Sequence, residues 1–167
     1  MAAARDLLLD GFDRVREAAR AALEGADEAV LTARLRPEAN SIAWLVWHLA
    51  RVQDDHVSDA AGVEQVWTSA GFCDRFGLPF DPGAIGYGFD SDQVGQVRGI
   101  SPDLLTAYLD AVTDATRAFV GELSEQDLDR VVDERWDPPV TLAVRLVSVL
   151  NDDLQHAGQA AFIRGCL

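Results

Sequence analysis

The chain has 167 residues, of which 49% are hydrophobic and 25% charged, so its length and composition favour one globular domain over a disordered segment. Its 28 acidic residues outnumber its 14 basic residues, all of them arginine, and the net charge is −14. Such a surface repels the phosphates of nucleic acids and of anionic membranes, so we expect neither to be a partner.

The N-terminal residues do not resemble a secretion signal, because their apolar run, residues 7–9, is short and has charged neighbours. Every uncharged stretch is too short to cross a bilayer. The two cysteines, Cys73 and Cys166, form at most one disulfide, and a reducing compartment keeps them as thiols. The sequence therefore predicts a cytoplasmic protein that is a single domain, residues 1–167.

The first predicted helix covers residues 4–24, where apolar residues recur every three or four positions until Gly25 ends the pattern. The second predicted helix begins at Asn40 or Ser41, both of which are good N-caps, and runs to about residue 61. Its first half is apolar on nearly every side. This half of the second helix is therefore expected to lie buried in the bundle.

The pattern breaks between the second and third predicted helices, over residues 63–99. Within residues 71–89 alone there are seven glycines and prolines and five aromatic residues. A connection of this length is uncommon in a small domain, and its aromatic content favours packing over disorder. We expect an irregular crossover that folds across the bundle and walls a pocket.

The third predicted helix covers residues 101–122 and begins with a capping serine followed by proline. A similar pattern predicts a short helix over residues 124–129. Thr141 caps the last predicted helix, residues 142–164, and Gly165 follows it. The result is an all-α four-helix bundle with a long crossover between its second and third helices and no convincing strand.

Two histidines and one acid carry the strongest chemical signal. Asp152 and His156 are four residues apart in the last helix, so their side chains lie on adjacent turns of one face. An acid and an imidazole at this spacing chelate one cation, and His48 from the second helix completes a three-ligand site with an open position. From spacing alone there are two alternatives: His48 is a hydrogen-bonded core histidine, and Asp152 and Asp153 form an exposed acidic face with His156 at the surface.

Two neighbours in the last helix are tied to this site. Asp153 lies three residues before His156 and competes with Asp152 for the ligand position. Gln159 lies three residues after His156 and is placed to hydrogen-bond an imidazole or a bound water, although simple helix packing explains it as well.

Four residues of the second helix are candidates for the surroundings of the site. Trp44 and Trp47 flank His48 and are expected to wall the pocket with apolar surface. Asp55 and His56 follow about two turns later. The catalytic group stays open: it is a metal-bound water or thiol, with Asp55 and His56 as possible catalytic residues. Asp55 is a candidate for orienting a ligand or acting as a base, and His56 is expected at the pocket or the surface, not as a metal ligand.

Two segments, residues 40–49 and residues 152–159, resemble segments of the DinB-like (YfiT-like) metalloenzyme superfamily. Residues 40–49, Asn-Ser-Ile-Ala-Trp-Leu-Val-Trp-His-Leu, are similar to its second helix, in which a His-Leu pair follows a Ser/Ile/Trp run. Residues 152–159, Asp-Asp-Leu-Gln-His-Ala-Gly-Gln, are similar to its last helix, in which a ligand, three residues and a histidine precede x-Gly-Gln. The helix layout and the crossover also fit, so the resemblance covers nearly the whole chain.

The resemblance implies that His48, Asp152 and His156 bind a divalent metal, with zinc or nickel expected. It selects Asp152 over Asp153, which then lies behind the ligands or in solvent. The superfamily more often has a histidine where this chain has Asp152, and the acid resembles its branch of mycothiol-dependent maleylpyruvate isomerases and thiol-dependent transferases.

That branch implies an activity and partners. The expected reaction is transfer of a low-molecular-weight thiol, such as mycothiol, to a small electrophile, or isomerisation of that electrophile. A homodimer is also implied, with the exposed halves of the first and third helices as candidate surfaces. Two alternatives use the same residues: a non-catalytic, metal-stabilised bundle that binds a small molecule, and a metal-dependent hydrolase with water as its nucleophile.

Overall fold

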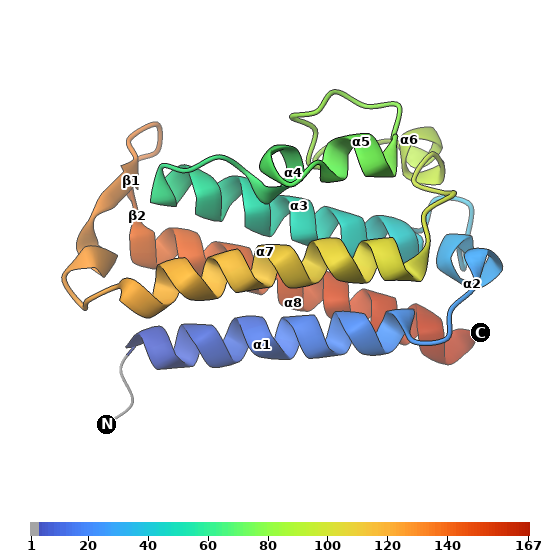
Figure 1. Ribbon diagram of the computed structural model, residues 1–167, viewed down its shortest axis with the longest axis horizontal. Coiled ribbons are helices and arrows are strands. Elements are labelled where there is room, and N and C mark those ends of the chain that lie inside the picture. Colours follow the sequence, from blue (N-terminus) through green and yellow to red (C-terminus); the bar gives the residue numbers. More distant parts are fainter. Residues whose placement is uncertain (1–3) are drawn as a thin grey trace.

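The computed structural model describes residues 4–167, in which four long helices form a bundle (Figure 1). Around the bundle each helix packs on two neighbours, in the order α1, α8, α3 and α7. α1 and α8 run in one direction and α3 and α7 in the other (Figure 1). The predicted all-α bundle is confirmed, with the helices α1 (Ala4–Leu23), α3 (Ile42–Ala61), α7 (Pro102–Glu122) and α8 (Leu142–Cys166).

The helices α3, α7 and α8 begin at the residues that the sequence predicts, because each N-cap hydroxyl accepts a hydrogen bond from a backbone N–H of the first turn. Ser41 Oγ accepts from Trp44 N at 3.2 Å, and Ser101 Oγ accepts from Leu104 N at 3.1 Å. At the other end of α3, Gly62 adopts the left-handed conformation with φ +69° and ends the helix.

Two apolar clusters fill the bundle. The larger joins the apolar half of α3 to α1, α7, α8 and the aromatic residues of the crossover. The smaller lies at the opposite end, around Leu142, Leu146 and Val120. Each fully buried leucine stabilises the fold by about 1.5–3 kcal/mol relative to an exposed one. The clusters fix α3 against α8, and these two helices carry the predicted donor residues.

The crossover is long because α3 and α7 point the same way, so the chain must return along the bundle before α7 begins (Figure 1). α3 has 20 residues and is therefore about 30 Å long. The expected irregular connection is wrong in one respect, since three short helices interrupt it: α4 (Val66–Ser69), α5 (Phe72–Phe76) and α6 (Ser91–Gly95). With four or five residues each, they are too short for periodicity to reveal.

Four smaller features also differ from the expectation. The first connector contains a short helix, α2 (Glu28–Thr32), and the short helix expected over residues 124–129 is a single 3-10 turn, η1 (Asp127–Asp129). The expectation of no strand is wrong, because β1 (Val131–Asp133) and β2 (Val140–Thr141) form a small antiparallel pair. α8 continues through Gly165 to Cys166 instead of ending before it.

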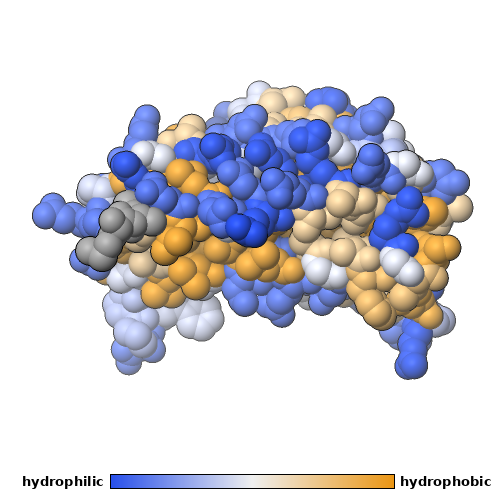
Figure 2. Space-filling model, turned by 90° about the horizontal axis from the view of Figure 1, so that it is seen from below, coloured by the Kyte–Doolittle hydropathy of each residue, from blue (hydrophilic) through white to orange (hydrophobic). Residues whose placement is uncertain are grey.

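The surface of the bundle mixes charged and apolar areas. Figure 2 shows one face, on which hydrophobic patches adjoin strongly hydrophilic ones. The exposed apolar residues of α8 include Val147, Leu154 and Phe162. Within residues 4–167 no helix combines the length and the hydropathy needed to cross a membrane. The implied homodimer stays a prediction.

Candidate metal centre

The three predicted donor side chains meet between α3 and α8. His48 Nε2 lies 3.9 Å from Asp152 Oδ2, and His156 Nε2 lies 3.6 Å from Asp152 Oδ1. One donor atom from each residue lies within 4.8 Å of the other two. In the described part of the chain this is the one such cluster of three His, Cys, Asp or Glu side chains.

The separations fit a single divalent cation. Metal–ligand bonds of about 2.1 Å in a tetrahedral arrangement place the donor atoms ~3.4 Å apart. One donor atom from each residue lies within 4.8 Å of the other two, so side-chain rotations would bring the three to this separation. Asp152 Oδ2 is buried and, across residues 4–167, has no hydrogen-bond partner. A buried carboxylate oxygen without a donor is costly, and a cation relieves that cost.

Outer hydrogen bonds set the tautomers of both imidazoles. His48 Nδ1 donates to the backbone oxygen of Ile85 in the crossover. His156 Nδ1 lies 3.1 Å from Gln159 Oε1, one helical turn further along α8. The Ile85 carbonyl can only accept, so His48 Nδ1 carries the proton and its Nε2 presents a lone pair to Asp152. Gln159 Oε1 favours the same tautomer for neutral His156. This is the form in which histidine binds a metal.

The pKa values of the three groups follow from burial and from their mutual contacts. Burial lowers the pKa of His48, whose exposed fraction is 3%. Burial acts in the same direction on His156, but its interactions with Asp152 and Gln159 outweigh burial and raise its pKa. Burial opposes ionisation of Asp152, yet the nearby His156 and His48 together lower its pKa. Ionised Asp152 therefore faces two imidazoles: His48, which is neutral, and His156, which protonates readily.

Aromatic rings border the donors. Trp44 stacks on His48 with the ring centroids 4.5 Å apart, and its edge meets His156 at 6.0 Å. Tyr87, from the crossover, meets the His48 ring edge-on at 5.6 Å and is 62% exposed. Trp47 lies on the crossover side of α3 and packs on Phe89 at 5.9 Å. Trp44 therefore lies against the donors, whereas Trp47 supports the crossover.

Asp55 and His56 lie in a separate polar pocket of about 340 Å³, which Arg145 of α8 also lines. Seven or eight residues along α3 from His48 correspond to about 10–12 Å. His56 Nδ1 lies 3.5 Å from Asp55 Oδ2 and 3.5 Å from Arg145 Nη1. Burial and the positive charge of Arg145 lower the pKa of His56. The pocket thus neighbours the donor cluster without adding to it.

Asp153 was expected either behind the ligands or in solvent, and its burial contradicts the second alternative. Its side chain is fully buried, and within the described residues neither carboxylate oxygen has a hydrogen-bond partner. Burial, reinforced by the negative charge of Asp152, raises its pKa well above the usual range. The solvated alternative is therefore wrong, because α8 rotates this position into the bundle.

Three features of the site have no signal in the local sequence. They are the Ile85 carbonyl, the Tyr87 ring and the glycine between them, Gly86, whose backbone lies against His48. All belong to the crossover, so only its path through space brings them to α3. The two thiols offer no alternative centre, since Cys73 and Cys166 are both free and join no cluster of donor residues in the described chain.

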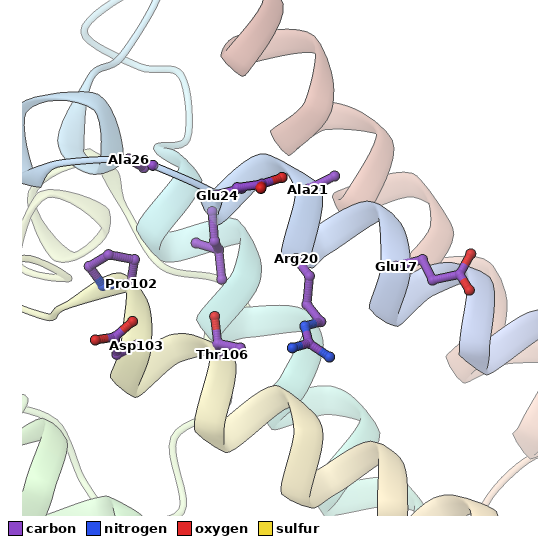
Figure 3. Close-up of a pocket in the computed structure, with 10 residues that line it drawn as sticks. Glu17, Arg20, Ala21, Glu24, Ala26, Pro102, Asp103 and Thr106 are labelled. Carbon is purple, nitrogen blue, oxygen red and sulfur yellow. The ribbon is translucent and has the colours of Figure 1, made fainter.

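A larger hollow of about 730 Å³ lies between the end of α1 and the start of α7 (Figure 3). Arg20 extends from α1 toward α7 in this view and approaches Asp110 at 3.5 Å. Its lining offers carboxylates, one arginine and backbone, and contains no histidine, cysteine or tyrosine. The chemistry-bearing cluster is therefore the one between α3 and α8.

The chain is similar to known proteins in sequence and in fold. The sequence profile of the family Mycothiol-S-transferase matches residues 7–167. A crystal structure described as the conserved protein of locus from Enterococcus faecalis superimposes with a TM-score of 0.91 at 29% sequence identity. The match covers 98% of this chain and 96% of that chain. No curated protein matches the sequence.

Proposed function

Because the chain belongs to the mycothiol S-transferase family, we propose that it is a divalent-metal-dependent enzyme that transfers a low-molecular-weight thiol of the mycothiol kind to a small electrophile. One observation carries the metal dependence: His48, Asp152 and His156 converge around a buried carboxylate oxygen that lacks a protein donor. Zinc or nickel suits two imidazoles and one carboxylate.

The proposed transfer needs a thiol that ionises at neutral pH. His48, Asp152 and His156 would hold the divalent cation, whose positive charge would lower the pKa of a thiol beside it. The thiolate sulfur then gives an electron pair to the electrophilic carbon, a C–S bond forms, and the leaving group departs with the electrons of its own bond. The thiol proton passes to solvent.

Trp44 and Tyr87 shape the space in which this exchange takes place. Trp44 covers one side of His48 and excludes water from it. Burial and the negative charge of Asp152 raise the pKa of Tyr87, so its phenol keeps its proton at neutral pH. A protonated phenol at the rim donates a hydrogen bond to a departing group.

The neighbouring polar pocket takes the non-reacting part of the thiol. Asp55 and Asp59 offer acceptors, while Arg145 offers donors and is partly neutralised by Asp133 at 3.0 Å. Such a mixture suits an uncharged, hydroxyl-rich group better than an anion or a cation. Asp55 and His56 lie about 10–12 Å along α3 from His48, so a thiol that occupies both places must span this distance.

Thiol consumption by the zinc-loaded and nickel-loaded protein, with mycothiol and a panel of electrophiles, tests the proposal. We expect metal-dependent turnover that Asp152→Asn lowers by a factor of at least about 100, because the variant loses an ionised ligand. Asp114→Asn, which changes a well-exposed acid on α7, is the matched control and keeps the wild-type rate.

Two outcomes separate the alternatives. Turnover of esters or amides without any thiol favours a hydrolase. Stoichiometric metal binding without turnover of any substrate class favours a metal-stabilised binding protein, and refutes the transferase.

A further inference from the structure

A buried arginine lies one turn beyond His48 on α3. The Arg51 side chain is fully buried, which is rare for an arginine and requires partners for its charge. Its Nη1 atom donates to Gln65 Oε1 at 2.9 Å and to Tyr108 Oη at 3.2 Å, and it lies 3.6 Å from Asp54 Oδ2. These contacts hold the guanidinium in one place and orientation.

The rest of the guanidinium binds the backbone of the crossover. Arg51 Nε donates to the oxygen of Ala84 at 3.2 Å, and Nη2 reaches the oxygen of Pro82 at 3.5 Å. Within residues 4–167, the segment 82–86 has one other side-chain hydrogen bond to the bundle, which is the bond from His48 Nδ1 to Ile85. Arg51 therefore anchors the backbone just before Ile85, whose carbonyl oxygen accepts the hydrogen bond from His48.

Gly86 shows how closely this segment approaches the imidazole. It has φ +97°, and a Cβ atom built there would lie 2.6 Å from His48 Nδ1. A glycine is needed both for this backbone conformation and for the close approach. The carbonyl of residue 85 thus meets His48 only while the segment keeps its place.

We propose that Arg51 is a positioning residue for the metal centre: by holding the carbonyls of Pro82 and Ala84, it keeps the Ile85 oxygen on His48 Nδ1 and so aims Nε2 at Asp152. The proposal goes beyond thiol transfer and rests only on the metal-binding part of the proposed function. Without the anchor, the imidazole is free to turn or to exchange tautomers, and an Nε2–H form cannot bind a metal through that atom.

Two readouts test this positioning, and neither needs catalytic turnover. Nitrogen NMR of the metal-free protein reports the tautomer of His48, and competition with a chelator measures zinc affinity. In Arg51→Met we expect a mixture of tautomers in place of the Nδ1–H form, and zinc affinity about 10–100-fold weaker. Arg51→Lys keeps the charge and part of the donor set, and we expect it to recover part of the loss.

Gln53→Met is the matched control for lost stability. Gln53 is also buried on α3 and donates to Thr116 Oγ1 at 2.7 Å, and within residues 4–167 its side chain has no hydrogen bond to the crossover. We expect this variant to be destabilised while its His48 tautomer and zinc affinity stay within twofold of wild type.

The glycine tests the same link from the other side, including the case in which Arg51 variants do not fold. Gly86→Ala pushes the segment off His48, and we expect the same change of tautomer and the same loss of affinity. Gly88→Ala is its control, because Gly88 also has a positive φ, +72°, but no atom lies within 4 Å of a Cβ there.

The possible results have separate meanings. An Arg51→Met protein that keeps the Nδ1–H tautomer and wild-type zinc affinity overturns the proposal, even if Gly86→Ala loses both. If Arg51→Met does not fold, a Gly86→Ala protein indistinguishable from Gly88→Ala overturns it. If wild type binds no metal, the proposed function fails, and the tautomer measurement alone decides the role of Arg51.

Discussion

The stability of metal-free Asp153→Asn relative to wild type is expected to rise with pH. Asp153 is fully buried in α8 without a hydrogen-bond partner among the described residues, and burial raises its pKa well above the usual range. An unfolded chain ionises this carboxyl at a pKa of about 3.9. Above that pH the folded protein holds one proton more than the unfolded chain, so its stability falls with pH.

The magnitude follows from this one proton. Between pH 4 and the folded pKa, the free energy of unfolding of wild type loses about 1.4 kcal/mol per pH unit through Asp153. Asparagine keeps the shape and cannot ionise. The unfolding free energy of Asp153→Asn minus that of wild type is therefore expected to rise by about 1.4 kcal/mol per pH unit. Each kcal/mol corresponds to about 2–4 °C in melting temperature.

Urea unfolding at a series of pH values, in the presence of a chelator, measures the difference. Any constant cost of burying the amide shifts the whole curve and leaves its slope unchanged, so the slope is the decisive quantity. Asp114→Asn is the exposed control, and its difference from wild type should stay flat. A flat difference for Asp153→Asn between pH 4 and 7 would refute a neutral, buried Asp153.

Two further variants separate packing from ligand binding. Leu109→Ala, at a fully buried position on α7, should cost about 2–5 kcal/mol of unfolding free energy in urea while zinc affinity stays unchanged; loss of metal in proportion to stability would contradict a site held by α3 and α8. Arg145→Gln, in the polar pocket, should raise KM for mycothiol about tenfold and leave metal content and the KM for free cysteine unchanged. An equal rise in KM for mycothiol and for free cysteine would show that the pocket does not bind the cosubstrate.

The helix bounds were largely predictable because caps are local. Backbone donors of the first turn are satisfied by the side chains of Ser41, Ser101 and Thr141. Such a cap is recognisable from three or four neighbouring residues. The short helices of the crossover and the β1–β2 pair were not predictable in this way. Elements of two to five residues carry too little periodicity, and tertiary packing decides their conformation.

The candidate site was predictable only as far as its helices. The spacing of Asp152 and His156 places both on one face of α8, and the resemblance to a known family adds His48. Neither indicates that Asp153 is buried, since that depends on how α8 is rotated against its neighbours. The Ile85 carbonyl and its anchor Arg51 depend on the path of a long crossover, which no local pattern specifies.

Metal content tests the central claim most directly. Wild type, His48→Ala, Asp152→Asn, His156→Ala and the control Asp114→Asn should be loaded with zinc or nickel, desalted and analysed by mass spectrometry. We predict about one equivalent in wild type and in the control, and its loss in each of the three variants while helical circular dichroism persists. Wild type that binds no metal under any loading, or triad variants that keep a full equivalent, would contradict a metal centre between α3 and α8.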